Sequence, residues 1–160
     1  MKENIYTIIV FTENKPGVLY RIADNFLKRK VNIESLTASE IETSNMSRFT
    51  IVVKGSKLTI EKIAKQLYKI VEVIKVLEET DDLLIFREIA LIKIAIKNAE
   101  QRKEVENFAS LFNAKIVSVS SDALVIEKSG TEEEINSLYT RLKSFGIREY
   151  VRSGRIALVK

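Results

Sequence analysis

The sequence predicts an α+β fold made of two ferredoxin-like βαββαβ units in tandem, each a sheet with two helices on one face. Two observations lead to this prediction. The same order of strand-like and helix-like apolar patterns runs through residues 1–80 and again through residues 81–160. The join between the two runs, near Glu79–Arg87, contains the short acidic stretch "EETDDLL", which favours two adjoining domains over a flexible linker.

The first predicted unit contains four strand-like runs and two helices. The strands are expected at 5–11, 31–41, 46–55 and 73–80, and the polar "ETSN" separates the second from the third. Apolar residues at helical spacing mark the helices. The first stripe is Val18, Leu19, Ile22, Ala23, Phe26 and Leu27, and the second is Ile60, Ile63, Ala64, Leu67, Tyr68 and Val71.

The second predicted unit repeats this order. Strand-like runs occupy 87–96, 114–120 and 123–130, and "IREYVRSGRIALVK" supplies the last strand or strands. Thr131 and Glu134 have the spacing of a capping box, and Gly146 stands where a left-handed C-cap is required. The two helix stripes are Val105, Phe108, Ala109 and Phe112, then Ile135, Leu138, Tyr139, Leu142 and Phe145.

The chain contains neither cysteine nor histidine. A disulfide, a zinc site, a Ser-His-Asp triad and a Cys-His pair are therefore excluded within it, and no metal site is predicted. Lysine or carboxylate chemistry is still available, but no pattern indicates it.

The net charge of +4 is modest, and the basic residues are dispersed along the chain. This predicts solvated faces and no nucleic-acid-binding stripe. The longest apolar runs are strand-sized, so no membrane span is predicted. The N-terminal segment lacks the hydrophobic region of a signal peptide, and we expect a cytoplasmic protein.

The first helix is bracketed by residues that shape the backbone and offer amides. Pro16 suits the first turn of a helix, and Gly17 permits close approach to the backbone. The helix N-terminus would then present free N–H donors and a positive dipole end, which suit a small carboxylate. Asn14 before it and Asn32 after the helix could donate to the carboxylate and accept from the ammonium of an amino acid.

A structural explanation of the same residues stays open. Pro-Gly is common turn chemistry between a strand and a helix, and Asn14 could simply cap the helix. Asn32 could be an edge-strand residue that faces solvent. Independently of the ligand, a sheet covered by helices on one face leaves its other face or an edge to a partner, which predicts an oligomer.

The sequence also resembles a known family. The segments "ENKPGVLYRIADNFLKRKVNIESLT", "SRFTIVV" and "KQLYKIVEVIKV", followed by "FNAKIVSVS" and "GIREYVRSGRIALVK", are similar to the small regulatory subunit of acetohydroxyacid (acetolactate) synthase. The glycine-containing turn alone would indicate only an ACT domain. The combination at these spacings is far more specific, and it covers nearly the whole chain.

The resemblance implies a division of roles between the two units. Residues 1–80 would form an ACT domain that binds the effector and pairs with the same domain of a second chain, and residues 81–160 an ACT-like domain without the glycine turn. The effector would be valine, or leucine or isoleucine, at the interface of the homodimer. The predicted effector-binding residues are Asn14, Pro16, Gly17, Val18, Asn32 and Ile33.

The resemblance further implies that the chain is not catalytic and holds no cofactor. It would activate a separate acetolactate synthase catalytic subunit and make it sensitive to feedback inhibition in branched-chain amino-acid biosynthesis. Thiamine diphosphate, Mg²⁺ and FAD are expected only on that subunit. Gln66 and Tyr68 are candidates for contact with it, although the helix stripe favours core packing for Tyr68.

One departure from the family concerns the end of the first helix. Lys30 and Val31 stand where relatives usually have glycine and a bulky residue. Lys30 would therefore take the left-handed conformation that ends the helix, at a cost of roughly 1 kcal/mol. The loop "SEIETSNMS" also varies within the family, and the effector preference is left open.

Two other functions are weighed against this one. The first is a free-standing ACT sensor that binds an amino acid and regulates another enzyme or a transcription factor. The second is an acylphosphatase-type hydrolase on the same fold, which needs an arginine and an asparagine together on a phosphate-cradling loop. The turn "TENKPGVLYR" fits that requirement poorly.

Overall fold

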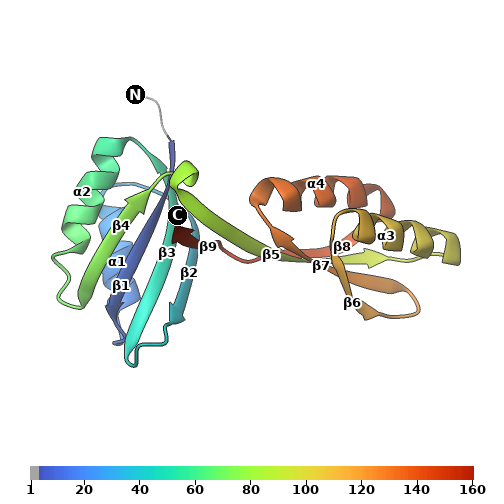
Figure 1. The fold of residues 1–160 in the computed structure, drawn as a ribbon, viewed down its shortest axis with the longest axis horizontal. Helices are drawn as coiled ribbons and strands as arrows, with labels where there is room; N and C mark the ends of the chain where they lie inside the picture. The colour runs from blue at the N-terminus through green and yellow to red at the C-terminus, as the bar shows by residue number, and fades with distance from the viewer. Residues whose placement is uncertain (1–3) are drawn as a thin grey trace. The chain divides into compact units, whose positions relative to one another are not determined.

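The computed structural model describes residues 4–160 and divides them into two compact units. The first unit ends at Phe86 and also includes Arg155–Lys160, and the second covers Arg87–Gly154. The predicted division at residue 80 differs in two respects: the first unit extends to Phe86, and the last six residues of the chain return to it. Figure 1 shows both units as sheets with two helices each.

The first unit is a βαββαβ sheet, which confirms the predicted fold. Its sheet is antiparallel in the order β2-β3-β1-β4. Alternate residues of β1, such as Tyr6, Ile8 and Val10, pack under the helices in the main core. The elements are β1 (Asn4–Glu13), α1 (Val18–Lys28), β2 (Ile33–Glu40), β3 (Met46–Gly55), α2 (Lys57–Leu67) and β4 (Val73–Glu79).

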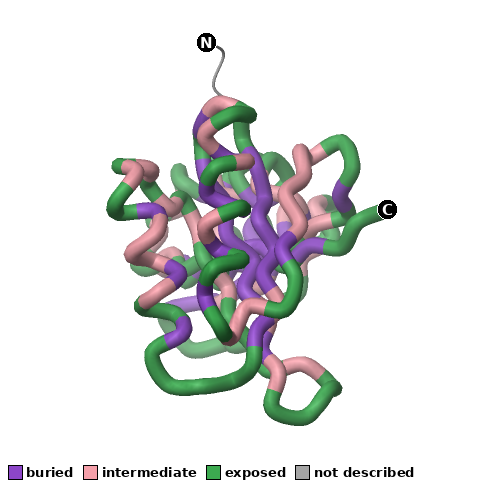
Figure 2. Tube along the Cα trace, turned by 90° about the vertical axis from the view of Figure 1, so that its left-hand side faces the viewer, coloured by how far each residue is buried: buried purple, intermediate pink, exposed green. Residues whose placement is uncertain are grey.

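The helices of this unit bury a narrower stripe than the sequence predicts. Val18, Ile22 and Phe26 of α1 are buried as expected, and Figure 2 shows buried residues concentrated along the strands and inner helix faces. Leu27 is 74% exposed, and Val71 beyond α2 is 93% exposed. Leu27 lies one residue, or about 100° around the helix, after the buried Phe26 and so faces away from the core, and Val71 lies beyond the end of α2.

The ends of α1 have left-handed residues. Gly17 precedes the helix with φ of 84°, and Lys30 follows it with φ of 55°. The conformation expected for Lys30 is therefore confirmed. Asn113 takes the same place after the first helix of the second unit, with φ of 50°.

The second face of the first sheet is partly covered by the chain's own C-terminus. Strand β9 (Ile156–Val159) pairs with the start of β5 (Leu84–Ala95), and Ala157 and Leu84 bury Ile9 of β1. The C-terminal segment therefore covers part of the face that was expected to need a partner, and it explains why residues 155–160 belong to the first unit.

Arg155 anchors this covering segment. Its side chain is 3% exposed, its Nη1 lies 2.6 Å from Oδ1 of Asp81, and the guanidinium stacks 4.1 Å from the ring centre of Phe86. The hydroxyl of Thr37 donates to the Arg155 carbonyl at 3.0 Å. The sequence predicts a solvated basic turn at this arginine, and that expectation is wrong, because Arg155 is buried against Asp81 and Phe86.

The second unit repeats the topology with the sheet order β6-β7-β5-β8. The predicted capping box at Thr131 and Glu134 is present, and Gly146 has φ of 90° as expected. Strand β5 begins three residues before the predicted 87–96 and follows a short 3-10 turn, η1 (Asp81–Leu83). The remaining elements are α3 (Ala99–Leu111), β6 (Lys115–Val119), β7 (Ala123–Gly130), α4 (Glu132–Leu142), η2 (Lys143–Phe145) and β8 (Ile147–Arg152).

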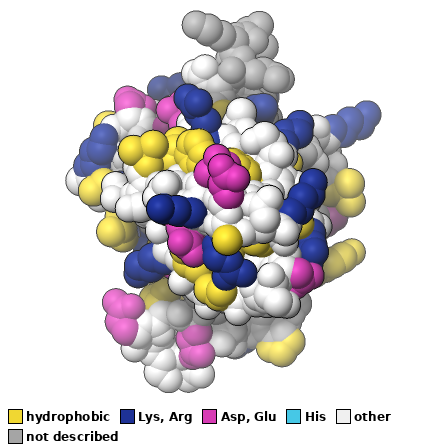
Figure 3. Space-filling model, turned by 90° about the vertical axis from the view of Figure 1, so that its right-hand side faces the viewer, with side chains coloured by type: hydrophobic (Ala, Val, Ile, Leu, Met, Phe, Trp, Pro, Cys, Tyr) yellow, Lys and Arg dark blue, Asp and Glu magenta, His cyan; other side chains and the backbone are white. Residues whose placement is uncertain are grey.

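Two kinds of functional feature are absent from residues 4–160. No described helix is long and apolar enough to cross a membrane. Within the same residues, no group of three or more acidic side chains could hold a metal ion. On the face drawn in Figure 3, the described basic and acidic side chains are interspersed, with hydrophobic side chains between them.

Candidate functional site

The N-terminus of α1 lies open beside the end of β1. The helix begins at Val18, and no side chain caps it. Pro16 lies in the turn before the helix, which corrects the expectation that it occupies the first turn. Gly17 holds the N-cap position in the left-handed conformation, where a β-carbon would be strained. The Val18 N–H donates to the Lys15 carbonyl at 3.4 Å, and the N–H groups of Leu19 and Tyr20 can donate to a ligand.

Asn14 joins this terminus to a neighbouring hairpin. Its backbone N–H donates to the carbonyl of Asn45, between β2 and β3, at 2.7 Å. Its exposed side chain makes no hydrogen bond with any described residue. Val18, by contrast, is 2% exposed and packs in the core, so only its backbone belongs to the site.

The other predicted effector residues lie at the opposite end of α1. Asn32 is exposed and its Nδ2 donates to Oε1 of Glu34 at 3.5 Å, and Ile33 packs partly against the core. A helix of 11 residues is roughly 16 Å long. One chain therefore does not bring Asn14 and Gly17 together with Asn32 and Ile33.

A hollow of about 610 Å³ adjoins Asn32. It lies between the end of α1, the end of β3 and the start of α2, and three of its side chains are cationic. No local sequence pattern predicts this hollow, because the residues that line it come from separate segments of the chain. The lining residues are Arg29, Lys30, Val31, Asn32, Glu34, Lys54, Gly55, Ser56 and Thr59.

The two edges of the first sheet differ. On β4, the hydroxyl of Tyr68 donates to the Val76 carbonyl at 3.2 Å and accepts from the Val76 N–H at 3.0 Å. Tyr68 is 53% exposed, so core packing was the wrong expectation, and the residue instead closes part of this edge. Gln66 is half-buried on α2. Among the described residues, no strand pairs with the outer edge of β2.

The second unit provides an internal comparison for the α1 terminus. The backbone bond from Ile96 N–H to the Asp122 carbonyl, 2.8 Å, corresponds to that from Asn14 to Asn45. Here, however, Asn98 caps α3 by accepting from the Gln101 N–H at 2.8 Å, and Gln101 Oε1 accepts from the Lys97 N–H at 2.7 Å. Side chains of the protein itself thus occupy this terminus.

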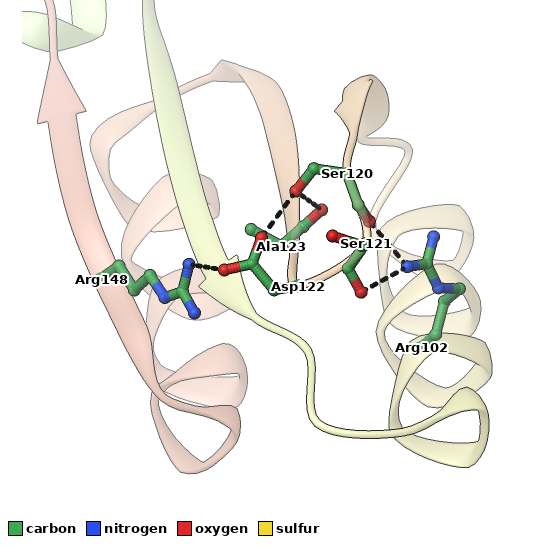
Figure 4. A network of polar contacts seen from close by, with 6 residues as sticks. All are labelled: Arg102, Ser120, Ser121, Asp122, Ala123 and Arg148. Atoms are coloured by element: carbon green, nitrogen blue, oxygen red, sulfur yellow. Dashed lines mark hydrogen bonds and ion pairs between the residues drawn. The ribbon is translucent and has the colours of Figure 1, made fainter.

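The hairpin beside α3 is also closed by its own contacts (Figure 4). Arg102 donates to the Ser120 carbonyl at 2.8 Å, and Arg148 lies 2.7 Å from Oδ2 of Asp122. Hydrogen bonds from Arg148 and Ser120 lower the pKa of the Asp122 carboxyl. The second unit therefore lacks the free donors that the first unit presents at the same place.

Charged side chains near the α1 terminus form two pairs. Arg21 Nη2 lies 2.6 Å from Oε1 of Glu72, and Lys15 pairs with Glu13. The hydrogen bond and charge of Glu13 raise the pKa of Lys15. Both carboxylates near the terminus are therefore held in ion pairs with cationic side chains.

Two family descriptions match the chain. Residues 8–75 match the ACT domain of small-subunit-like proteins of acetohydroxyacid synthase, and residues 87–160 match the small subunit of acetolactate synthase. Together they cover both units.

Individual relatives match over nearly the full length. A probable acetolactate synthase small subunit from Archaeoglobus fulgidus is 41% identical over 97% of this chain and 96% of its own. The acetolactate synthase small subunit of Mycolicibacterium smegmatis is 41% identical over 96% of this chain and 89% of its own. The crystal structure of the acetolactate synthase small subunit from Thermotoga maritima superposes with a TM-score of 0.90 at 34% identity, covering 100% of this chain and 98% of that one.

Proposed function

This chain belongs to the family of acetolactate synthase small subunits, and from that premise we propose a specific regulatory role. The chain binds a separate acetolactate synthase catalytic subunit and raises its activity. It also makes that subunit sensitive to feedback inhibition by a branched-chain amino acid, with valine favoured over leucine and isoleucine. The chain itself performs no catalysis.

One observation carries the effector part of the proposal. Of the four described α-helices, only α1 begins without a side-chain cap, whereas Ser56, Asn98 and Thr131 cap the others. Uncapped N–H groups and the positive end of the helix dipole favour a carboxylate. In this proposal the effector's carboxylate binds at Gly17, and the Asn14 amide contributes polar contacts.

The effector site is built from two chains. Asn14 and Gly17 are separated from Asn32 and Ile33 by the length of α1, so a small amino acid reaches both groups only if a second copy supplies one of them. The outer edge of β2, which starts beside Asn32, pairs with no strand of the described residues, whereas Tyr68 closes part of the other edge at β4. We therefore place the homodimer interface on the ACT domain at this edge.

Regulation follows from a difference in affinity. Valine bound across two ACT domains would favour the dimer arrangement that holds the catalytic subunit in its less active state. Such coupling between sites is typically about 1–3 kcal/mol. Because one methylene changes binding by about 1–3 kcal/mol, the apolar part of the pocket decides between valine and isoleucine.

The cofactors of the reaction belong, in this proposal, to the catalytic subunit. Thiamine diphosphate, Mg²⁺ and FAD are assigned there, and this chain contributes binding surfaces only. Gln66 and Tyr68 stay candidates for that contact, since Tyr68 keeps half of its surface exposed. The cytoplasmic location expected from the sequence also stays a prediction.

Reconstitution with the catalytic subunit tests the proposal. The purified chain should raise acetolactate formation and confer inhibition by valine. Asn32→Ala should abolish the inhibition and spare the activation, whereas loss of both together would contradict a separable effector site. Absence of any activation, with amino-acid binding retained, would favour the free-standing sensor. Hydrolysis of an acyl phosphate by the chain alone would favour the hydrolase.

A further inference from the structure

An arginine side chain lies over the uncapped terminus of α1. Arg21 Nη1 is 3.2 Å from the position that a β-carbon on Gly17 would occupy. Its Nη2 donates to Oε1 of Glu72 at 2.6 Å, and its Nε is buried without a hydrogen-bond partner among the described residues. A guanidinium has five N–H donors, and Nη1 forms no hydrogen bond with a described residue, so the Nη1 donors stay available beside the first-turn amides.

The surroundings of Arg21 fix its position. Glu72, which lies between α2 and β4, has a side chain only 16% exposed and holds one edge of the guanidinium. Glu13, the other nearby carboxylate, is paired with Lys15. The edge of Arg21 that carries Nη1 extends over Gly17, where any larger side chain would enter the same space.

The second unit has a corresponding arginine, Arg102, beside a helix terminus that is capped by a side chain. Arg102 follows Asn98 at the same spacing at which Arg21 follows Gly17. It turns away to the carbonyls of Ser120 and Ser121, at 2.8 and 3.5 Å. Gly146 takes the place of Glu72 in the second unit. The Glu72 carbonyl accepts from the N–H of Glu13 at the end of β1, and the Gly146 carbonyl accepts from the N–H of Ala95 at the end of β5. Among the described residues, the arginine–glutamate pair therefore accompanies only the uncapped terminus.

We propose that Arg21 binds the carboxylate of the amino-acid effector together with the first-turn amides of α1, and that Glu72 positions it. This inference rests on the proposed function and adds a residue to its effector site. A charge-assisted hydrogen bond is about twice as strong as a neutral one. The site would therefore select a free α-carboxylate over an uncharged amide at the same position.

Calorimetric titration of the full chain with valine and with valinamide tests this role. We expect the wild type to bind valine at least about tenfold more tightly than valinamide. Arg21→Gln should lose most of this preference, and Arg21→Lys should keep part of it. Glu72→Gln should weaken valine binding less than Arg21→Gln does.

Arg102→Gln is the matched control, because it removes the corresponding arginine of the second unit and should leave both affinities unchanged. The preference is a ratio measured within one variant, so partial unfolding does not alter it. A full preference in Arg21→Gln would overturn the role of Arg21 while the effector site stands. No discrimination by the wild type would also overturn it, and failure of the wild type to bind valine would overturn the proposed effector function as well.

Discussion

Replacing Gly17 by alanine should both destabilise the first unit and weaken effector binding. Gly17 has φ of 84°, and the added β-carbon would lie 3.2 Å from Nη1 of Arg21. The left-handed conformation costs a residue with a β-carbon roughly 1–2 kcal/mol. For a unit of this size, each kcal/mol lowers the melting temperature by about 4–8 °C.

Gly146→Ala is the matched control for this experiment. Gly146 has φ of 90°, and a β-carbon there would have no atom within 4 Å. Both variants should therefore show a similar loss of stability in thermal and urea unfolding followed by circular dichroism. Only Gly17→Ala should also weaken valine binding in calorimetry, because only its β-carbon displaces Arg21 and obstructs the helix terminus. Wild-type stability or wild-type valine affinity in Gly17→Ala would refute this reasoning.

Three further predictions concern stability. Tyr68→Phe should lower the free energy of unfolding, measured in urea, by about 0.5–1.5 kcal/mol, because it removes two hydrogen bonds to Val76 at a half-exposed site. An unchanged free energy of unfolding would show that water replaces the hydroxyl. Asp81→Asn should lower the melting temperature by more than a typical surface substitution, since it removes the carboxylate 2.6 Å from the 3%-exposed Arg155, and an unchanged melting temperature would contradict an anchoring role. A hydrogen bond from the Thr131 backbone N–H lowers the pKa of Glu134, so the stability that this carboxylate contributes is present above its unfolded pKa and is lost as pH falls through its folded pKa. Glu134→Gln should therefore flatten the acid side of a plot of unfolding free energy against pH, and an unchanged plot would contradict this assignment.

The elements of both units were predictable because their signals are local. The capping box at Thr131 and the left-handed Gly146 each depend on a few consecutive residues. The return of Arg155 to Asp81 was not predictable, since it joins residues 74 positions apart through tertiary packing. The exposure of Leu27 was not predictable either, because helical spacing does not show how wide a stripe of α1 the core covers.

The candidate site was predicted in part. The sequence pointed to the start of α1, where Gly17 is left-handed and no side chain caps the helix. It also grouped Asn32 with that terminus, whereas within one chain the rigid helix between them holds the two apart. The pairing of Arg21 with Glu72, 51 positions later, had no local signal. An alignment of the two repeats would have shown that a capping asparagine, Asn98, stands where the first repeat has Gly17, which has no side chain to cap the helix.

Mixing two defective variants tests the central claim most directly, namely that the effector site is shared between two copies. Asn14→Ala and Asn32→Ala should each lose most of their valine binding when titrated alone. After subunit exchange, a mixed dimer would contain one intact site, formed by Asn14 of one copy and Asn32 of the other. The account predicts recovery of about a quarter of the wild-type sites, as statistical pairing of a twofold dimer requires. No recovery, with exchange verified by mass spectrometry, would contradict a site built from two chains.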